Sequence, residues 1–108
     1  MFDSHCHLNF EAFTDQEEKT INKAKANGVN FFLVPGTDLK TSQKAIKIAQ
    51  KHPGVWAAVG IHPHHAQKYN TKDLEKIKKL AQKKTAAAIG EIGLDYYQYQ
   101  KTKYNNYQ

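Results

Sequence analysis

Two histidines near the start of the chain are spaced to bind one metal ion. Residues 3–7 read Asp-Ser-His-Cys-His and end a short segment that we expect to form a strand. Side chains alternate across a strand, so Asp3, His5 and His7 would share one face and Cys6 would point away. Two imidazoles at this spacing suit a metal ion, with Asp3 behind them as an acceptor for an N–H group. A histidine pair that binds no metal is the alternative interpretation, because the motif is short.

A second histidine group follows the third expected strand. Residues 60–65 read Gly-Ile-His-Pro-His-His. Pro63 restricts the turn and Gly60 allows a close approach of the backbone, so His62 and His64 would be presented by a well-held loop. Ligands of open α/β sheets bind at the carboxyl edge of the strands, where this loop would lie. We expect His62 and His64 to meet a ligand there; an ordinary polar turn before the next helix is the alternative.

An acidic residue lies at the end of the fourth apolar segment. Glu91 has only apolar residues and glycines around it in residues 89–94. Burial of an unpaired carboxylate is costly, so a metal ion or a proton must compensate it. Glu91 is therefore a candidate metal ligand or bridging carboxylate, with a glutamate facing water or a lysine as the alternative. Asp95 is a weaker candidate, since it could instead cap a following helix.

The elements that must position these residues alternate along the chain. Four short apolar segments are separated by three helical patterns, which is typical of an α/β fold with a parallel sheet. The near-continuous apolar character of the segments predicts strands covered on both faces. The expected strands are residues 1–5, 30–34, 55–60 and 86–92.

Helix starts are indicated by capping residues. Thr14-Asp15-Gln16-Glu17 resembles a capping box for the first helix, Thr37 or Asp38 would cap the second, and Thr71 would open the third. Residues 1–97 are thus expected to form one domain. Residues 98–108 are rich in Tyr, Gln and Asn and show no helical stripe, so we expect a poorly packed tail.

Composition restricts the partners. All sixteen basic residues are lysine and the formal net charge is +6, which favours a polyanion contacted through its phosphates. Lysines that merely cover the solvent faces of helices are the alternative. The longest apolar run, around residues 31–34, is far shorter than the ~20 residues of a membrane span, and no secretion signal is visible. We therefore expect no membrane partner and a cytoplasmic location.

Three motifs together resemble one enzyme family. Residues 1–8 (Met-Phe-Asp-Ser-His-Cys-His-Leu), 59–64 (Val-Gly-Ile-His-Pro-His) and 90–97 (Gly-Glu-Ile-Gly-Leu-Asp-Tyr-Tyr) are similar, in order and spacing, to the N-terminal signatures of the TatD-type metal-dependent deoxyribonucleases. The resemblance implies an amidohydrolase-like (β/α)8 TIM barrel, of which this chain would form the first half with about four strand–helix units. It also implies a hydrolase that cleaves phosphodiester bonds in DNA with one or two divalent ions (Mg, Mn or Zn).

The resemblance further implies roles for single residues. His5 and His7 would bind the first metal ion, Glu91 would bind or bridge metal ions and act in catalysis, and His62 would lie beside them and meet substrate. A barrel of this kind takes ~250 residues, whereas this chain has 108.

We therefore expect little or no activity from the chain alone. A non-catalytic remnant or split-gene fragment that binds nucleic acid weakly is the alternative. A complementary half-barrel or self-association would cover the open sheet edges.

Overall fold

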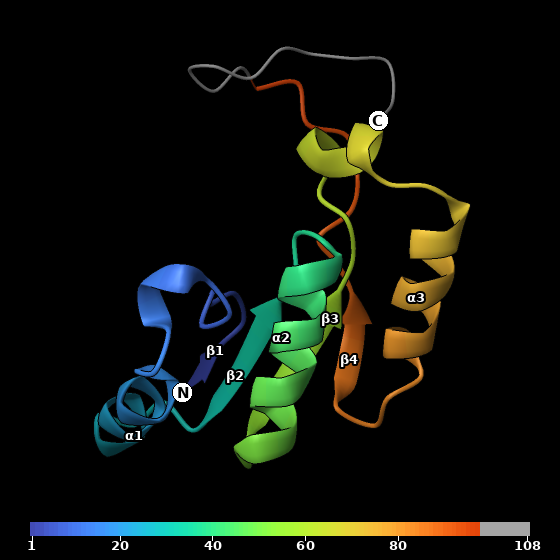
Figure 1. The fold of residues 1–108 in the computed structure, drawn as a ribbon. Helices are drawn as coiled ribbons and strands as arrows, with labels where there is room; N and C mark the ends of the chain where they lie inside the picture. Colours follow the sequence, from blue (N-terminus) through green and yellow to red (C-terminus); the bar gives the residue numbers. More distant parts are fainter. Residues whose placement is uncertain (98–108) are drawn as a thin grey trace.

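The structure, a computed structural model, describes residues 1–97. Its elements are β1 (Phe2–Asp3), η1 (Glu11–Phe13), α1 (Glu17–Ala26), β2 (Phe31–Pro35), α2 (Leu39–Lys51), β3 (Val55–Val59), η2 (Pro63–Lys68), α3 (Thr71–Ala81) and β4 (Ala86–Ile89). Within these residues four strands form one parallel sheet in the order β1-β2-β3-β4 (Figure 1). The predicted α/β fold is confirmed. The tail expected at 98–108 lies outside the described residues.

The helices pack on one face of the sheet, and the core lies between the two layers (Figure 1). Val34 and Val59 from the central strands and Ala45 from α2 are fully buried there. On the opposite face Phe2 and Phe31 are each 54% exposed and Trp56 is 43% exposed. The expectation of strands covered on both faces is therefore wrong for residues 1–97, because no described element packs against this second face.

Capping explains where two of the helices begin. Asp38, not Thr37, caps α2, and its carboxylate accepts a 2.7 Å hydrogen bond from the backbone N–H of Thr41. Asn70 caps α3 in the same way. The capping box expected at Thr14 is wrong: α1 begins at Glu17 with no side-chain cap, since Thr14 instead closes the short helix η1.

The first and last strands are shorter than predicted. β1 ends at Asp3 and β4 at Ile89, so the histidine motif after β1 and Glu91 after β4 both lie in loops. The segment at Pro63–Lys68, expected as a turn, forms η2 with Pro63 in its first turn, as proline's fixed φ allows. These loops all leave the carboxyl ends of parallel strands and therefore gather at one edge of the sheet.

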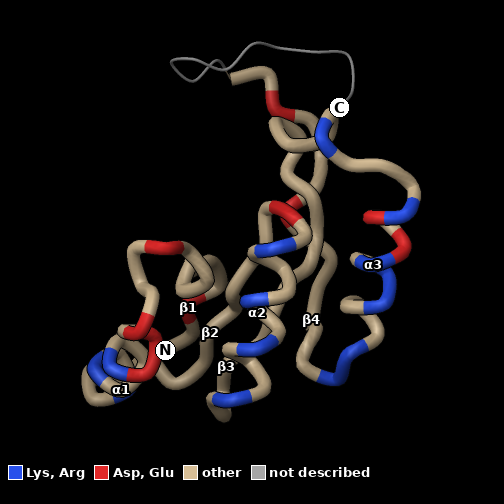
Figure 2. Tube along the Cα trace, viewed as in Figure 1, with Lys and Arg blue, Asp and Glu red and all other residues tan. Residues whose placement is uncertain are grey.

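Lysines follow the helices and are scattered along α2 and α3 (Figure 2). Lys47 and Lys51 on α2 and Lys76 on α3 are exposed. This distribution agrees with the alternative interpretation that many lysines cover solvent-facing helix surfaces. No helix within residues 1–97 has the length and apolar character needed to cross a bilayer.

Candidate metal centre

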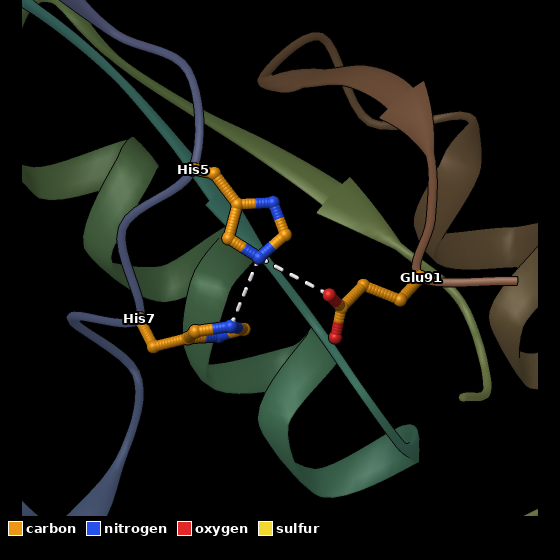
Figure 3. A group of neighbouring side chains, drawn as sticks. All are labelled: His5, His7 and Glu91. Carbon is orange, nitrogen blue, oxygen red and sulfur yellow. Dashed lines mark hydrogen bonds and ion pairs between the residues drawn. The ribbon is translucent and has the colours of Figure 1, made fainter. Parts of the chain in front are cut away.

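Two histidines and one glutamate meet at the carboxyl edge of the sheet (Figure 3). His5 and His7 come from the loop after β1, and Glu91 comes from the loop after β4. The Nε2 atom of His5 is 3.1 Å from Nε2 of His7 and 3.1 Å from Oε1 of Glu91. One nitrogen or oxygen atom from each residue lies within 4.8 Å of the others. We call this set the first histidine group.

The loop after β1 is held to the neighbouring strand, because the backbone N–H of Cys6 donates a 3.1 Å hydrogen bond to the carbonyl oxygen of Leu33 in β2. The Oδ1 atom of Asp3 accepts a 3.1 Å hydrogen bond from the backbone N–H of His5. Asp3 thus fixes the main chain of His5 rather than a ring nitrogen, which differs from the role expected from the sequence. The ring of His7 stacks on Phe10 with the centroids 4.2 Å apart, which restricts its orientation.

Cys6 lies between these histidines but is turned away from them. Its Sγ atom is 3.5 Å from the carbonyl oxygen of Leu33, to which it donates a hydrogen bond. Burial, followed by the nearby charge of Asp3, raises the pKa of the thiol to about 12. Metals bind the thiolate, so Cys6 in this state is not a ligand.

The charge state of His7 suits a metal ligand. Burial lowers the pKa of His7, an effect that the charge of Glu91 opposes and that of His5 adds to. A lowered pKa keeps the imidazole neutral at neutral pH, so that one ring nitrogen retains its lone pair for a cation. Burial similarly lowers the pKa of His62, with the charge of Glu91 again opposing it.

The donor atoms of the first histidine group fit a divalent cation. The two Nε2 atoms are 3.1 Å apart, and their lone pairs repel unless a proton or a cation lies between them. Two imidazoles and one carboxylate form a ligand set that Zn²⁺ and related first-row ions accept. These side chains therefore satisfy the chemical requirement for a metal centre.

A second histidine group lies near the first at the same edge and consists of His62, His64 and Asp95. The Oδ2 atom of Asp95 is 3.8 Å from Nε2 of His62 and 3.3 Å from Nε2 of His64. The carbonyl oxygen of Asp95 also lies 3.1 Å from Nε2 of His64. The side chain of His64 is 11% exposed, and those of the other two are about one quarter exposed.

Hydrogen bonds give the second group a different chemistry. The Nδ1 atom of His62 accepts a 3.2 Å hydrogen bond from the backbone N–H of His64, so the proton of the neutral ring is on Nε2. A carbonyl oxygen only accepts, so Nε2 of His64 also carries a proton and donates it to Asp95. As these side chains lie, both Nε2 atoms face oxygen acceptors, although the three side chains also form a set that could hold a metal ion.

Comparison with protein families shows to which family the chain belongs. Residues 2–108 match the family model described as TatD related DNase. The chain belongs to this family. A TatD 3'-5' ssDNA/RNA exonuclease from Pantoea ananatis is 39% identical over 97 residues, which are 89% of this chain and 37% of that protein. The metal-dependent hydrolase YabD from Bacillus subtilis is 38% identical over 97 residues, or 90% of this chain and 38% of YabD.

A solved structure of the TatD family has the same fold. YjjV, a TatD homologue from Escherichia coli K12, superposes with a TM-score of 0.81 at 30% identity, over 91% of this chain and 39% of YjjV. This likeness confirms that the four parallel strands and their helices are half of a TatD-type (β/α)8 barrel. The chain thus spans less than two fifths of the length of these relatives.

The residues indicated by the TatD motifs lie in two separate groups. His5, His7 and Glu91 lie together, whereas His62 and His64 lie with Asp95 instead. Asp95 also accepts a 3.0 Å hydrogen bond on Oδ1 from the backbone N–H of Tyr97.

Two buried polar residues, Asn9 and Ser42, were not predicted from the sequence. For Ser42 a signal was present, because it continues the apolar face that Ala45, Ile46 and Ala49 form on α2.

Proposed function

We propose that this chain binds a divalent metal ion through His5, His7 and Glu91 and takes part in TatD-like hydrolysis of phosphodiester bonds in DNA. The observation that carries the proposal is the convergence of two Nε2 atoms and one carboxylate oxygen from loops at opposite ends of the described chain. The names of the relatives, ssDNA/RNA exonucleases and a metal-dependent hydrolase, support it. Mg²⁺, Mn²⁺ and Zn²⁺ are the ions we propose.

A metal ion bound here would supply positive charge that polarises a phosphoryl oxygen and acidifies water. The chain contributes the ligands. His7 offers a lone pair because its lowered pKa keeps the ring neutral, and His5 offers Nε2 at the exposed side of the centre. Glu91 offers a carboxylate oxygen 3.1 Å from His5, where it can bind the ion or accept a proton, and we assign it the catalytic role.

His62 and His64 are the proposed substrate-binding residues. In this proposal a phosphate oxygen would replace Asp95 as the acceptor of their Nε2–H groups. The carboxylate of Asp95, 3.3 Å from His64, orients these donors. In this arrangement the first group binds the cation and the second group binds the phosphate beside it.

The test combines metal binding with turnover. Purified chain is titrated with Mn²⁺ and then incubated with end-labelled single-stranded DNA and Mn²⁺ or Mg²⁺. Cleavage that is lost in His5→Ala but retained in His52→Ala supports hydrolysis, because His52 closes α2 away from both histidine groups. If wild-type chain takes up no Mn²⁺ beyond His5→Ala, the metal centre is contradicted.

A second candidate function is nucleic-acid binding without hydrolysis. The relatives are more than twice as long as the matched segment, and the net charge of +6 favours phosphate contacts. Mn²⁺ uptake and salt-sensitive DNA binding without cleavage would support this candidate.

We propose that a complementary half-barrel or a second copy of the chain covers the exposed sheet face. A monomer in sedimentation would contradict self-association.

A further inference from the structure

Two buried polar side chains stand out in the described part of the chain. Asn9 is 2% exposed and Ser42 is 0% exposed, and these are the buried polar or charged residues within residues 1–97. Neither belongs to a histidine group. Each one connects the first turn of α2 with a loop at the carboxyl edge of the sheet.

Asn9 anchors the loop that carries His5 and His7. It lies two residues after His7, and its Nδ2 atom donates hydrogen bonds to the carbonyl oxygens of Pro35 at 2.8 Å and Thr41 at 3.0 Å. One amide group thus joins this loop to the end of β2 and to the start of α2. Because the side chain of Asn9 is buried, water does not compete for these bonds.

Ser42 anchors the loop after β3. Its hydroxyl donates to the carbonyl oxygen of Gly60 and accepts from the backbone N–H of the same residue, each at 3.2 Å. The two bonds fix both polar groups of Gly60 to α2. A Cβ atom at Gly36 would overlap Ser42, so the close approach of α2 to the end of β2 requires glycine there.

Gly60 in turn supports Glu91. A Cβ atom at Gly60 would come within 2.6 Å of the carbonyl carbon of Gly90 and 2.7 Å of the carbonyl oxygen of Glu91, so the two backbones are in direct contact. The backbone N–H of Glu91 donates a 2.7 Å hydrogen bond to the carbonyl oxygen of Gly36. The position of Glu91 therefore depends on the backbones of Gly36 and Gly60, both of which contact Ser42.

We propose that Asn9 and Ser42 are positioning residues that set the distance between the two ligand-bearing loops. The proposal rests on the proposed metal centre. Neither side chain contacts the ligand atoms; Asn9 acts through the backbone near His7, and Ser42 acts through Gly60 on Glu91. Apolar side chains would fill the same space, but hydrogen bonds also fix direction, and a ligand set needs its atoms held at defined separations.

The test compares Ser42→Ala and Asn9→Ala with Ile21→Val. Ile21 is buried in α1 and belongs to neither ligand-bearing loop, so Ile21→Val should lower the Tm and leave the hydrogen bonds of Asn9 and Ser42 intact. We expect each positioning variant to weaken Mn²⁺ binding by about tenfold, measured by electron paramagnetic resonance, and Ile21→Val to leave it unchanged. Ser42→Cys, which keeps a small side chain with a weak donor, should fall between wild type and Ser42→Ala, and it replaces Ser42→Ala if that variant does not fold.

A second measurement needs no metal. Amide hydrogen exchange at Gly60 and Glu91 should be faster in Ser42→Ala than in wild type and unchanged in Ile21→Val. Wild-type Mn²⁺ affinity in both positioning variants, or an equal loss in Ile21→Val, would overturn the proposal. If wild-type chain binds no Mn²⁺, the proposed function fails, and unchanged exchange at Glu91 in Ser42→Ala then overturns the positioning role while faster exchange supports it.

Discussion

The first histidine group (His5, His7, Glu91) and the second (His62, His64, Asp95) each contain two imidazoles and one acid, with candidate atoms within 4.8 Å of one another. They differ in their hydrogen bonds. In both groups an Nε2 atom faces the acid, but only in the first group is a 3.1 Å approach of two Nε2 atoms found within residues 1–97. The types of residue in a group therefore do not decide whether it binds a cation or an anion. We expect the two Nε2 atoms that face each other in the first group to make it the stronger cation site.

The largest expected effect is on Mn²⁺ affinity, which should depend on the first histidine group and not on the second. Removal of a direct ligand, as in His7→Ala or Glu91→Gln, should weaken Mn²⁺ binding by about 100-fold or more. His64→Ala should change it by less than about twofold, because Nε2 of His64 lies in the other group and faces the carbonyl oxygen of Asp95. Isothermal titration calorimetry measures all three. Comparable losses in His64→Ala would show that both groups bind metal.

Loss of the negative charge should have opposite effects in the two groups. It should weaken metal binding at Glu91 but strengthen oligonucleotide binding at Asp95. Asp95→Asn removes a negative charge next to the proposed phosphate donors and should tighten binding of a single-stranded oligonucleotide by about threefold. Asp15→Asn is the matched control, because Asp15 is exposed, remote and at a φ of 61° that asparagine tolerates. Fluorescence anisotropy at fixed salt measures the affinities. Equal tightening in both variants would assign the effect to net charge alone.

Substitution of Cys6 tests whether the first histidine group includes a fourth ligand. With a pKa of about 12 the thiol stays protonated at neutral pH, so Cys6→Ser should leave Mn²⁺ affinity within about twofold of wild type. Alkylation by iodoacetamide near neutral pH should be at least about tenfold slower in folded chain than in urea. Fast alkylation of folded chain would mean that Cys6 is accessible as a thiolate, which would contradict its raised pKa.

The smallest effect concerns pH. Burial lowers the pKa of His62, so the unfolded chain takes up a proton first as the pH falls. The stabilisation from neutral His62 is therefore complete above its unfolded pKa near 6.5 and is lost as the pH falls through that value toward the lower folded pKa. His62→Asn keeps an acceptor for the N–H of His64 and should lose less Tm than wild type between about pH 7.5 and about pH 5.5. An identical loss would contradict the lowered pKa.

The fold was predictable because its signals are local. The apolar segments and the cap at Asp38 give the strand–helix order, and parallel strands bring the loops to one edge. The expectation that His5, His7, His62 and Glu91 converge followed from this edge and from strand alternation, although β1 ends at Asp3 and the alternation does not reach the histidines. The loop hydrogen bonds of His5 and the stacking of His7 on Phe10 position them instead.

Other features were not predictable from sequence patterns. The separation of His62 from Glu91's group depends on η2, whose first turn directs the N–H of His64 to Nδ1 of His62. No periodicity encodes such a contact. The roles of Asn9 and Ser42 depend on bonds across 26 and 18 residues, which appear only once the strands are assembled.

The open face of the sheet gives this chain a built-in optical probe. Trp56 is the single tryptophan of the sequence and is 43% exposed on that face, beside Phe31 on the neighbouring strand. Its indole therefore emits from a partly aqueous environment, and any polypeptide that covers the face would shift the emission to shorter wavelength. Spectra recorded against chain concentration or against an added half-barrel thus report coverage without any label, independently of the chemistry at the histidine groups.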